Sequence, residues 1–272
     1  MLAKIQALLP DNRRGRFIEP FLGSGVVYLN TPGFSSYVIA DANRDLIDLY
    51  GFIRTDASTV AALVTELFGE LSDNTPSRYY RMREEFNACS VGTLRRAALF
   101  IFLNRFGFNG MCRYNQAGGF NVPHGQAKTI LNPTDAILGM GRILNERPAQ
   151  LLCSDFRLLL AIADEGDTVY LDSPYVALSS TANFSSYIAG GFSDADQYDL
   201  AQLARRASVR GALVIISNHD TAQTRDLYAG ASIIELQVTR SVGADASSRK
   251  KVGELLAVFG TNLDAGVQLA VA

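Results

Sequence analysis

Four consecutive residues, Asp172-Ser173-Pro174-Tyr175, have the most specific chemistry in the sequence. The Asp172 carboxylate and the backbone carbonyl of Ser173 can accept hydrogen bonds from one amino group. Pro174 restricts the backbone, and Tyr175 adds a flat ring next to these acceptors. Such a group suits the exocyclic amine of a planar base that stacks on the tyrosine. The alternative is a turn at the end of a strand with a packed tyrosine, and the four residues alone favour that alternative.

Acidic residues follow apolar stretches that are typical of buried strands, at Asp41, Asp155 and Asp172. Ligands of open α/β sheets bind at the carboxyl ends of the strands, and carboxylates there accept hydrogen bonds from ribose hydroxyls or an adenine amine. Asp41 lies 18 residues after Gly23 in the turn Gly23-Ser24-Gly25, close to the spacing of a ribose-binding acid. Each acid alone is more often a helix N-cap, and Gly-x-Gly is as often a plain turn. Together they predict a site for a small molecule.

The expected elements alternate between strands and helices. Strands are expected at residues 17–21, 36–41, 151–153, 168–171, 213–216, 233–238 and 255–259. Helices are expected at residues 43–50, 57–68, 79–87 and 92–104, after a short amphipathic helix that ends before Pro10. This order predicts an α/β sheet with a binding site at its carboxyl edge.

A helical segment interrupts the α/β pattern. Helical patterns and recurring arginines dominate residues 53–146, whereas residues 1–52 and 147–272 contain the strands. We therefore predict a domain formed by residues 1–52 and 147–272, with residues 53–146 as an inserted domain. Within the insert, residues 107–115 are rich in turn-forming, aromatic and amide residues, and we expect a β-hairpin there.

The composition excludes several classes of protein. A share of 48% apolar residues argues against a disordered chain. The longest apolar runs fall well short of the ~18 residues of a membrane span, and the N-terminus lacks a secretory signal, so we expect a soluble cytoplasmic protein. The net charge of −2 is unlike that of a non-specific nucleic-acid binder, although it permits a local basic face. Three dispersed cysteines and two histidines predict neither a disulfide framework nor a metal site.

Several segments together resemble the motifs of one family, the Dam-like DNA adenine-N6 methyltransferases of bacteria and phages. These segments are residues 19–25, 40–43, 103–115, 120–123, 172–175, 181–184, 217–221 and 248–251. The resemblance extends from about Leu8 to about Gly260. It implies an α/β fold with a Rossmann-like class I methyltransferase sheet and an inserted helical DNA-recognition domain that carries a β-hairpin.

The resemblance also implies a cofactor site. S-adenosylmethionine would be the methyl donor, with its methionine part wrapped by the turn at residues 19–25 and its ribose bound by Asp41. The family holds the cofactor's adenine at the positions of Asp155 and Phe156. The implied cofactor-binding residues are Glu19, Pro20, Phe21, Gly23, Gly25, Asp41, Asp155 and Phe156. The family chemistry requires no metal ion.

The catalytic residues that the resemblance implies are Asp172, Ser173, Pro174 and Tyr175. The target adenine would leave the duplex, stack on Tyr175 and donate its amine hydrogens to Asp172 and the Ser173 carbonyl. Its nitrogen would then attack the methyl group directly, so catalysis would depend mostly on positioning and electrostatics. The expected partner is double-stranded DNA with a GATC-like site, bound by a monomer.

The inserted segment would read the DNA. Arg113 is the best candidate for base readout, because an arginine bound to guanine by two hydrogen bonds is the commonest specific contact. Phe108 is expected to wedge into the base stack, and Met111 to face base edges. The full set of expected DNA-binding residues is Arg95, Arg96, Arg105, Phe108, Asn109, Met111, Arg113, Asn115, Pro123, Arg249 and Lys250. For Arg95 and Arg96 the alternative is a solvated helix face, and for Arg249 and Lys250 it is surface solubility.

The sequence departs from the family pattern at two places. The segment of Lys-Trp-Ala-Gly-Gly-Lys type that opens the family's chains has no counterpart here, and the chain contains no tryptophan. Ser173 replaces the first proline of the usual Asp-Pro-Pro-Tyr, so we expect a weakened catalytic step. These departures leave a second hypothesis open, a catalytically impaired relative that binds DNA as a regulator or competitor.

Overall fold

The computed structural model describes residues 1–69, 74–126, 129–176, 191–238 and 252–260. Its helices are α1 (Leu2–Leu8), α2 (Val26–Leu29), α3 (Arg44–Phe68), α4 (Pro76–Ala88), α5 (Leu94–Phe106), the 3-10 helix η1 (Phe108–Gly110), α6 (Thr134–Glu146), α7 (Phe156–Ile162), α8 (Asp194–Val209) and α9 (Ala222–Leu227). Its strands are β1 (Arg16–Glu19), β2 (Ser36–Asp41), β3 (Ala149–Cys153), β4 (Thr168–Leu171), β5 (Leu213–His219), β6 (Ser232–Val238) and β7 (Val252–Phe259). None of the described helices combines the length and the apolar character needed to cross a membrane.

The described strands form one seven-stranded sheet in the order β3-β2-β1-β4-β5-β7-β6. Strands β3, β2, β1, β4 and β5 are parallel, and β7 is antiparallel to both of its neighbours. This arrangement confirms the predicted α/β class and the Rossmann-like methyltransferase sheet. The strand order changes direction at β1, which has β2 on one side and β4 on the other. Open α/β sheets bind ligands at such a switch point, outside the carboxyl ends of the strands.

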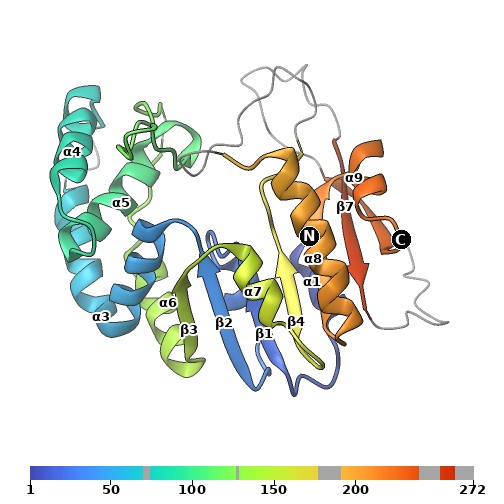
Figure 1. Ribbon diagram of the computed structural model, residues 1–272. Helices are drawn as coiled ribbons and strands as arrows, with labels where there is room; N and C mark the ends of the chain where they lie inside the picture. Colours follow the sequence, from blue (N-terminus) through green and yellow to red (C-terminus); the bar gives the residue numbers. More distant parts are fainter. Residues whose placement is uncertain (70–73, 127–128, 177–190, 239–251, 261–272) are drawn as a thin grey trace.

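Helices cover both faces of the sheet (Figure 1). On one face, Leu160 of α7 and Leu200 of α8 belong to a core that includes Ile18 of β1. On the other face, Ile5 of α1 belongs to a second core that includes Phe17 of β1. Because successive strand residues point to opposite faces, the adjacent apolar residues Phe17 and Ile18 enter different cores. A central strand that is covered on both sides is therefore apolar throughout.

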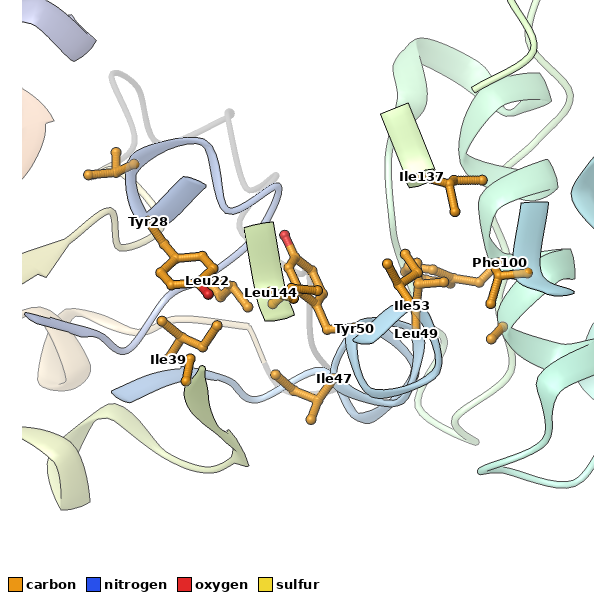
Figure 2. Close-up of a cluster of buried hydrophobic side chains, with 14 of the residues drawn as sticks. Leu22, Tyr28, Ile39, Ile47, Leu49, Tyr50, Ile53, Phe100, Ile137 and Leu144 are labelled. Carbon is orange, nitrogen blue, oxygen red and sulfur yellow. The ribbon is translucent and has the colours of Figure 1, made fainter. Parts of the chain in front are cut away.

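Helices α3, α4, α5 and α6 lie beside the β3 edge of the sheet and account for most of residues 53–146 (Figure 1). Helix α3 continues across the predicted boundary after residue 52 and is interrupted only at Asp56, where φ is −154° and ψ is 82°. Figure 2 shows one buried cluster that extends from Tyr28 near the sheet through Ile53 of α3 to Phe100 of α5. This one core contains residues from both sides of the predicted boundary. The division into two domains therefore stays a prediction.

The segment expected as a β-hairpin, residues 107–115, forms a compact turn without an extended strand among the described residues. Its only antiparallel pairing in this part is two isolated bridges, one of which joins Tyr114 to Phe120. Asn109 and Gly110 both have left-handed backbone, with φ values of 52° and 63°. Two consecutive residues of this kind cannot continue an extended strand, which explains the missing ladder.

Candidate functional site

The turn after β1 brings backbone close to α3. Gly23 and Gly25 have φ values of 48° and 66°, a conformation that favours glycine. A Cβ atom on Gly25 would lie 2.4 Å from the hydroxyl oxygen of Tyr50, whereas one on Gly23 would meet nothing within 4 Å. The turn is therefore packed against α3 at Gly25 and open at Gly23, so a ligand can approach the backbone there.

Replacing Gly25 with alanine is expected to lower the free energy of unfolding by at least ~1–2 kcal/mol, because left-handed backbone disfavours a Cβ atom. The collision with Tyr50 adds to this cost and tilts the turn. The same change at Gly23 retains the backbone penalty without the collision, so Gly23→Ala is the matched control. Urea unfolding of both variants measures the difference, and equal losses would contradict the packing argument.

Asp41 joins this turn to the start of α3. Its Oδ2 atom accepts a hydrogen bond from the backbone N–H of Gly23 at 3.0 Å, and its Oδ1 atom accepts one from the backbone N–H of Asn43 at 2.9 Å. Burial raises the pKa of this carboxyl. A carboxylate has about four lone-pair positions, so Asp41 retains acceptor capacity for hydroxyl donors such as those of a ribose.

Glu19 ends β1 and is almost completely buried, with 2% of its surface exposed. Its Oε2 atom accepts a hydrogen bond from the backbone N–H of Tyr28 at 2.9 Å, which fixes α2 against the strand. Burial raises the pKa of Glu19 well above its usual value, and the charges of Asp172 and Asp41 raise it further. Because β2 and β4 both pair in parallel with β1, the three carboxyl groups of Glu19, Asp41 and Asp172 lie at the same edge of the sheet.

Aromatic rings line the neighbouring part of the sheet edge. Phe21 stacks on Phe156 with ring centroids 5.4 Å apart, and Phe192 packs against both rings. Asp155 immediately precedes α7, which begins at Phe156. It caps this helix by accepting a hydrogen bond from the backbone N–H of Arg157 at 2.8 Å. Sequence reasoning missed Phe192, because it lies just before α8 and is distant from the other two rings in the chain.

The Asp172-Ser173-Pro174-Tyr175 segment follows β4, as predicted. The Asp172 side chain is exposed, and its Oδ1 atom accepts a hydrogen bond from the Ser217 hydroxyl at 2.8 Å. The Ser173 side chain is buried, and its hydroxyl has no hydrogen-bond partner among the described residues. The Pro174 carbonyl accepts a hydrogen bond from Nε2 of Gln197 at 2.6 Å. The Asp172 carboxylate is thus held by the end of β5, and the Pro174 backbone is held by α8.

Residues at the end of β5 hold this segment in place. Oδ1 of Asn218 accepts a hydrogen bond from the backbone N–H of Val176 at 3.0 Å, and the His219 ring nitrogen Nδ1 lies 2.8 Å from the Val176 carbonyl. The His219 ring also packs edge to face against Tyr175, with centroids 4.9 Å apart. Sequence reasoning gave Ser217, Asn218 and His219 no role, although they end a strand next to β4.

Most of the expected DNA-binding residues belong to the helical region and have exposed or half-buried side chains. Exposed among them are Arg105, Phe108, Asn109, Asn115 and Pro123, and half-buried are Arg95, Met111 and Arg113. Arg113 donates from Nε to Oδ1 of Asn121 at 2.8 Å and from Nη2 to the Asn121 carbonyl at 3.2 Å. These bonds use two of its five donors, so the side chain is oriented and still able to bind a partner. Arg249 and Lys250 lie outside the described residues.

The structure contradicts the DNA contact expected of Arg96. Arg96 has only 7% of its surface exposed and pairs with Asp45, whose Oδ1 lies 2.5 Å from its Nε atom. It also donates from Nη1 to the carbonyls of Phe86 and Cys89 at 2.7 and 2.9 Å. Its neighbour Arg95 faces outward and pairs with Glu85 at 2.7 Å. Arg96 is therefore a structural residue. It differs from Arg95 because adjacent helix positions point in directions about 100° apart, so one side chain enters the core and the other faces outward.

Comparisons with known proteins agree with this arrangement. A family model described as D12 class N6 adenine-specific DNA methyltransferase matches residues 1–242. The DNA adenine methylase of Salmonella typhi is 42% identical over 242 residues, which cover 89% of this chain and 85% of that protein. The DNA adenine methylase of Escherichia coli (strain K12) is 41% identical with the same coverage. That of Vibrio cholerae serotype O1 is 39% identical over 264 residues, which cover 97% of this chain and 93% of that protein.

Proposed function

The chain belongs to the D12 class N6 adenine-specific DNA methyltransferases, and we propose that it methylates adenine in duplex DNA with S-adenosylmethionine as the methyl donor. The observation that carries this proposal is the placement of Asp41 and Asp172 on either side of β1, at the switch point of the sheet. Both carboxylates lie near enough to Glu19 to raise its pKa. One crevice can therefore take a methyl donor beside β2 and a base beside β4.

The residues beside β2 fit the methyl donor. The open side of Gly23 would admit its amino-acid part, and Asp41 has acceptor capacity for its ribose hydroxyls. When bound, S-adenosylmethionine supplies an electrophilic methyl group on a sulfonium centre. Two backbone N–H groups orient the Asp41 carboxylate toward the turn and the start of α3.

The residues beside β4 fit the target base. Asp172 and the Ser173 carbonyl would accept the two amine hydrogens of an adenine that has left the duplex, while Tyr175 stacks on its ring. These hydrogen bonds direct the nitrogen lone pair toward the methyl group. The nitrogen must lose one proton after methylation, and the Asp172 carboxylate would accept it. Because Ser173 retains its backbone carbonyl, this arrangement does not require a proline at that position.

The exposed residues of the helical region would bind the DNA. Phe108 is expected to enter the base stack, Arg113 to read a base, and Arg105 and Asn109 to contact phosphates. We propose that the target is a GATC-like site and that a monomer binds the duplex in the cytoplasm.

Replacing Arg113 with alanine is expected to weaken binding to the cognate duplex by about 1–3 kcal/mol and to relax discrimination at one base pair. Fluorescence anisotropy with a GATC duplex and with single-substitution duplexes measures both effects. Arg81 on α4 is an exposed arginine with no expected base contact, so Arg81→Ala is the control. If Arg113→Ala lowered affinity equally for every duplex, its role would be phosphate contact instead.

The proposed function is tested by transfer of a labelled methyl group to duplex DNA, followed by digestion to nucleosides. We expect label in N6-methyladenine from a GATC duplex and much less from a duplex without that site. The impaired-relative hypothesis predicts DNA binding without transfer. It is not favoured, because the relatives named as methylases match over 85% to 93% of their own length. Absence of transfer to any duplex would reject the proposed activity.

A further inference from the structure

Asp45, in the first turn of α3, is a buried carboxylate that two distant parts of the chain share. It has 7% of its surface exposed. Arg96 of α5 donates from Nε to Oδ1 at 2.5 Å and from Nη2 to Oδ2 at 3.0 Å. The Tyr114 hydroxyl donates to Oδ2 at 2.7 Å. Tyr114 lies between Arg113 and Asn115, so Asp45 holds the segment expected to read DNA.

The same turn of α3 leads back to the cofactor side of the site. Oδ1 of Asn43, the residue that caps α3, accepts a hydrogen bond from the backbone N–H of Asp45 at 3.0 Å. The Asn43 side chain donates from Nδ2 to the sulfur of Cys112 at 3.3 Å. Its backbone N–H binds Asp41, the expected ribose acceptor. A continuous set of contacts therefore joins Asp41 to Tyr114 through Asn43 and Asp45.

No residue in this set can move alone without weakening a hydrogen bond to the next residue. Its members are buried or half-buried, and a buried polar group that loses its partner costs about 1–3 kcal/mol. A ligand that shifts or fixes Asp41 acts on the first turn of α3, which also carries the acceptor of Tyr114. The Tyr114 ring packs edge to face on Phe120, with centroids 5.7 Å apart, and its hydroxyl also lies 3.5 Å from Oδ1 of Asn43. Both acceptors near this hydroxyl therefore belong to the start of α3.

We propose that Asp45 couples the methyl-donor site to the DNA-reading segment, with Tyr114 as the positioning residue that makes the connection. Donor binding at Asp41 and duplex binding at residues 108–115 then strengthen each other. The inference rests on the proposed function, because it takes these two places as the two binding sites. Tyr114 acts through the position of Arg113 and does not contact the reacting atoms.

The test compares the wild type with Tyr114→Phe, which retains the ring and removes the hydroxyl. The dissociation constant of a fluorescent GATC duplex is measured with and without saturating S-adenosylhomocysteine, which lacks a transferable methyl group. For the wild type we expect the compound to tighten duplex binding about tenfold, within the usual range of coupling between sites. For Tyr114→Phe we expect less than about a twofold change. The same factors must appear when the affinity for S-adenosylhomocysteine is measured with and without duplex.

Tyr79→Phe is the matched control, because the buried Tyr79 hydroxyl donates to the Val122 carbonyl at 3.0 Å and not to the start of α3. We expect it to retain the wild-type coupling, although both variants lose a buried hydrogen bond. Equal coupling in the wild type and Tyr114→Phe, or an equal loss in both variants, would overturn the proposal. A wild type that binds both partners without coupling overturns this inference alone. A wild type that binds neither overturns the proposed function, and this inference with it.

Discussion

Replacing Asp172 with asparagine is expected to slow methyl transfer by about 10²- to 10³-fold, which is the typical cost of losing one group that stabilises developing charge. The amide has the shape of the carboxylate, and its oxygen can still accept the hydrogen bond from Ser217. What it loses is the negative charge that polarises the target amine and the capacity to accept its proton. The fold and the donor affinity should not change, because Asp172 is exposed and lies on the side proposed for the base.

Single-turnover rates with saturating enzyme and duplex measure the chemical step without product release. Asp226→Asn is the control, because Asp226 is an exposed residue of α9 outside the proposed site. It should transfer methyl groups at the wild-type rate. If Asp172→Asn were also as fast as the wild type, Asp172 could not be the acceptor of the amine, and the proposed arrangement of the base would be wrong.

The strands could be predicted closely because each is a short apolar run between polar or turn-forming residues. The prediction for residues 36–41 matches β2 in both bounds. The continuity of α3 could not be predicted in this way. The change of composition near residue 52 suggested a domain boundary, whereas the helix is held together by packing against α5 and α6. Such tertiary contacts override a local pattern.

The positions of the candidate site residues were predictable where a residue comes at the end of a strand. Asp41 and Asp172 are of this kind, since parallel strands end at the same edge. The partners that fix them, Asn43 and Ser217, are polar residues like many others, and only the fold brings them within hydrogen-bonding distance. Phe192 escaped prediction for the same reason, because its contacts with Phe21 and Phe156 are made across the sheet edge.

Arg95 and Arg96 show most clearly what cannot be predicted from the sequence, because sequence alone gives both residues the same expected role. Replacing Arg96 with methionine is expected to lower the free energy of unfolding by about 3–5 kcal/mol, since it leaves the buried Asp45 carboxylate without its cation. The carbonyls of Phe86 and Cys89 would also lose a donor. Methionine fills similar apolar volume over the Phe86 ring, so the loss reports mainly on charge and hydrogen bonding.

The matched control is Arg95→Met, one position earlier on the same helix. Its ion pair with Glu85 is more than one-third exposed on both sides, and such pairs contribute about 0–1 kcal/mol. Urea unfolding should therefore separate the two variants by at least ~2 kcal/mol. Similar losses would show that Arg96 is not the structural cation that its burial indicates. Adding Asp45→Asn to Arg96→Met should restore part of the stability, because the amide removes the unpaired charge while its oxygen can still accept from Tyr114.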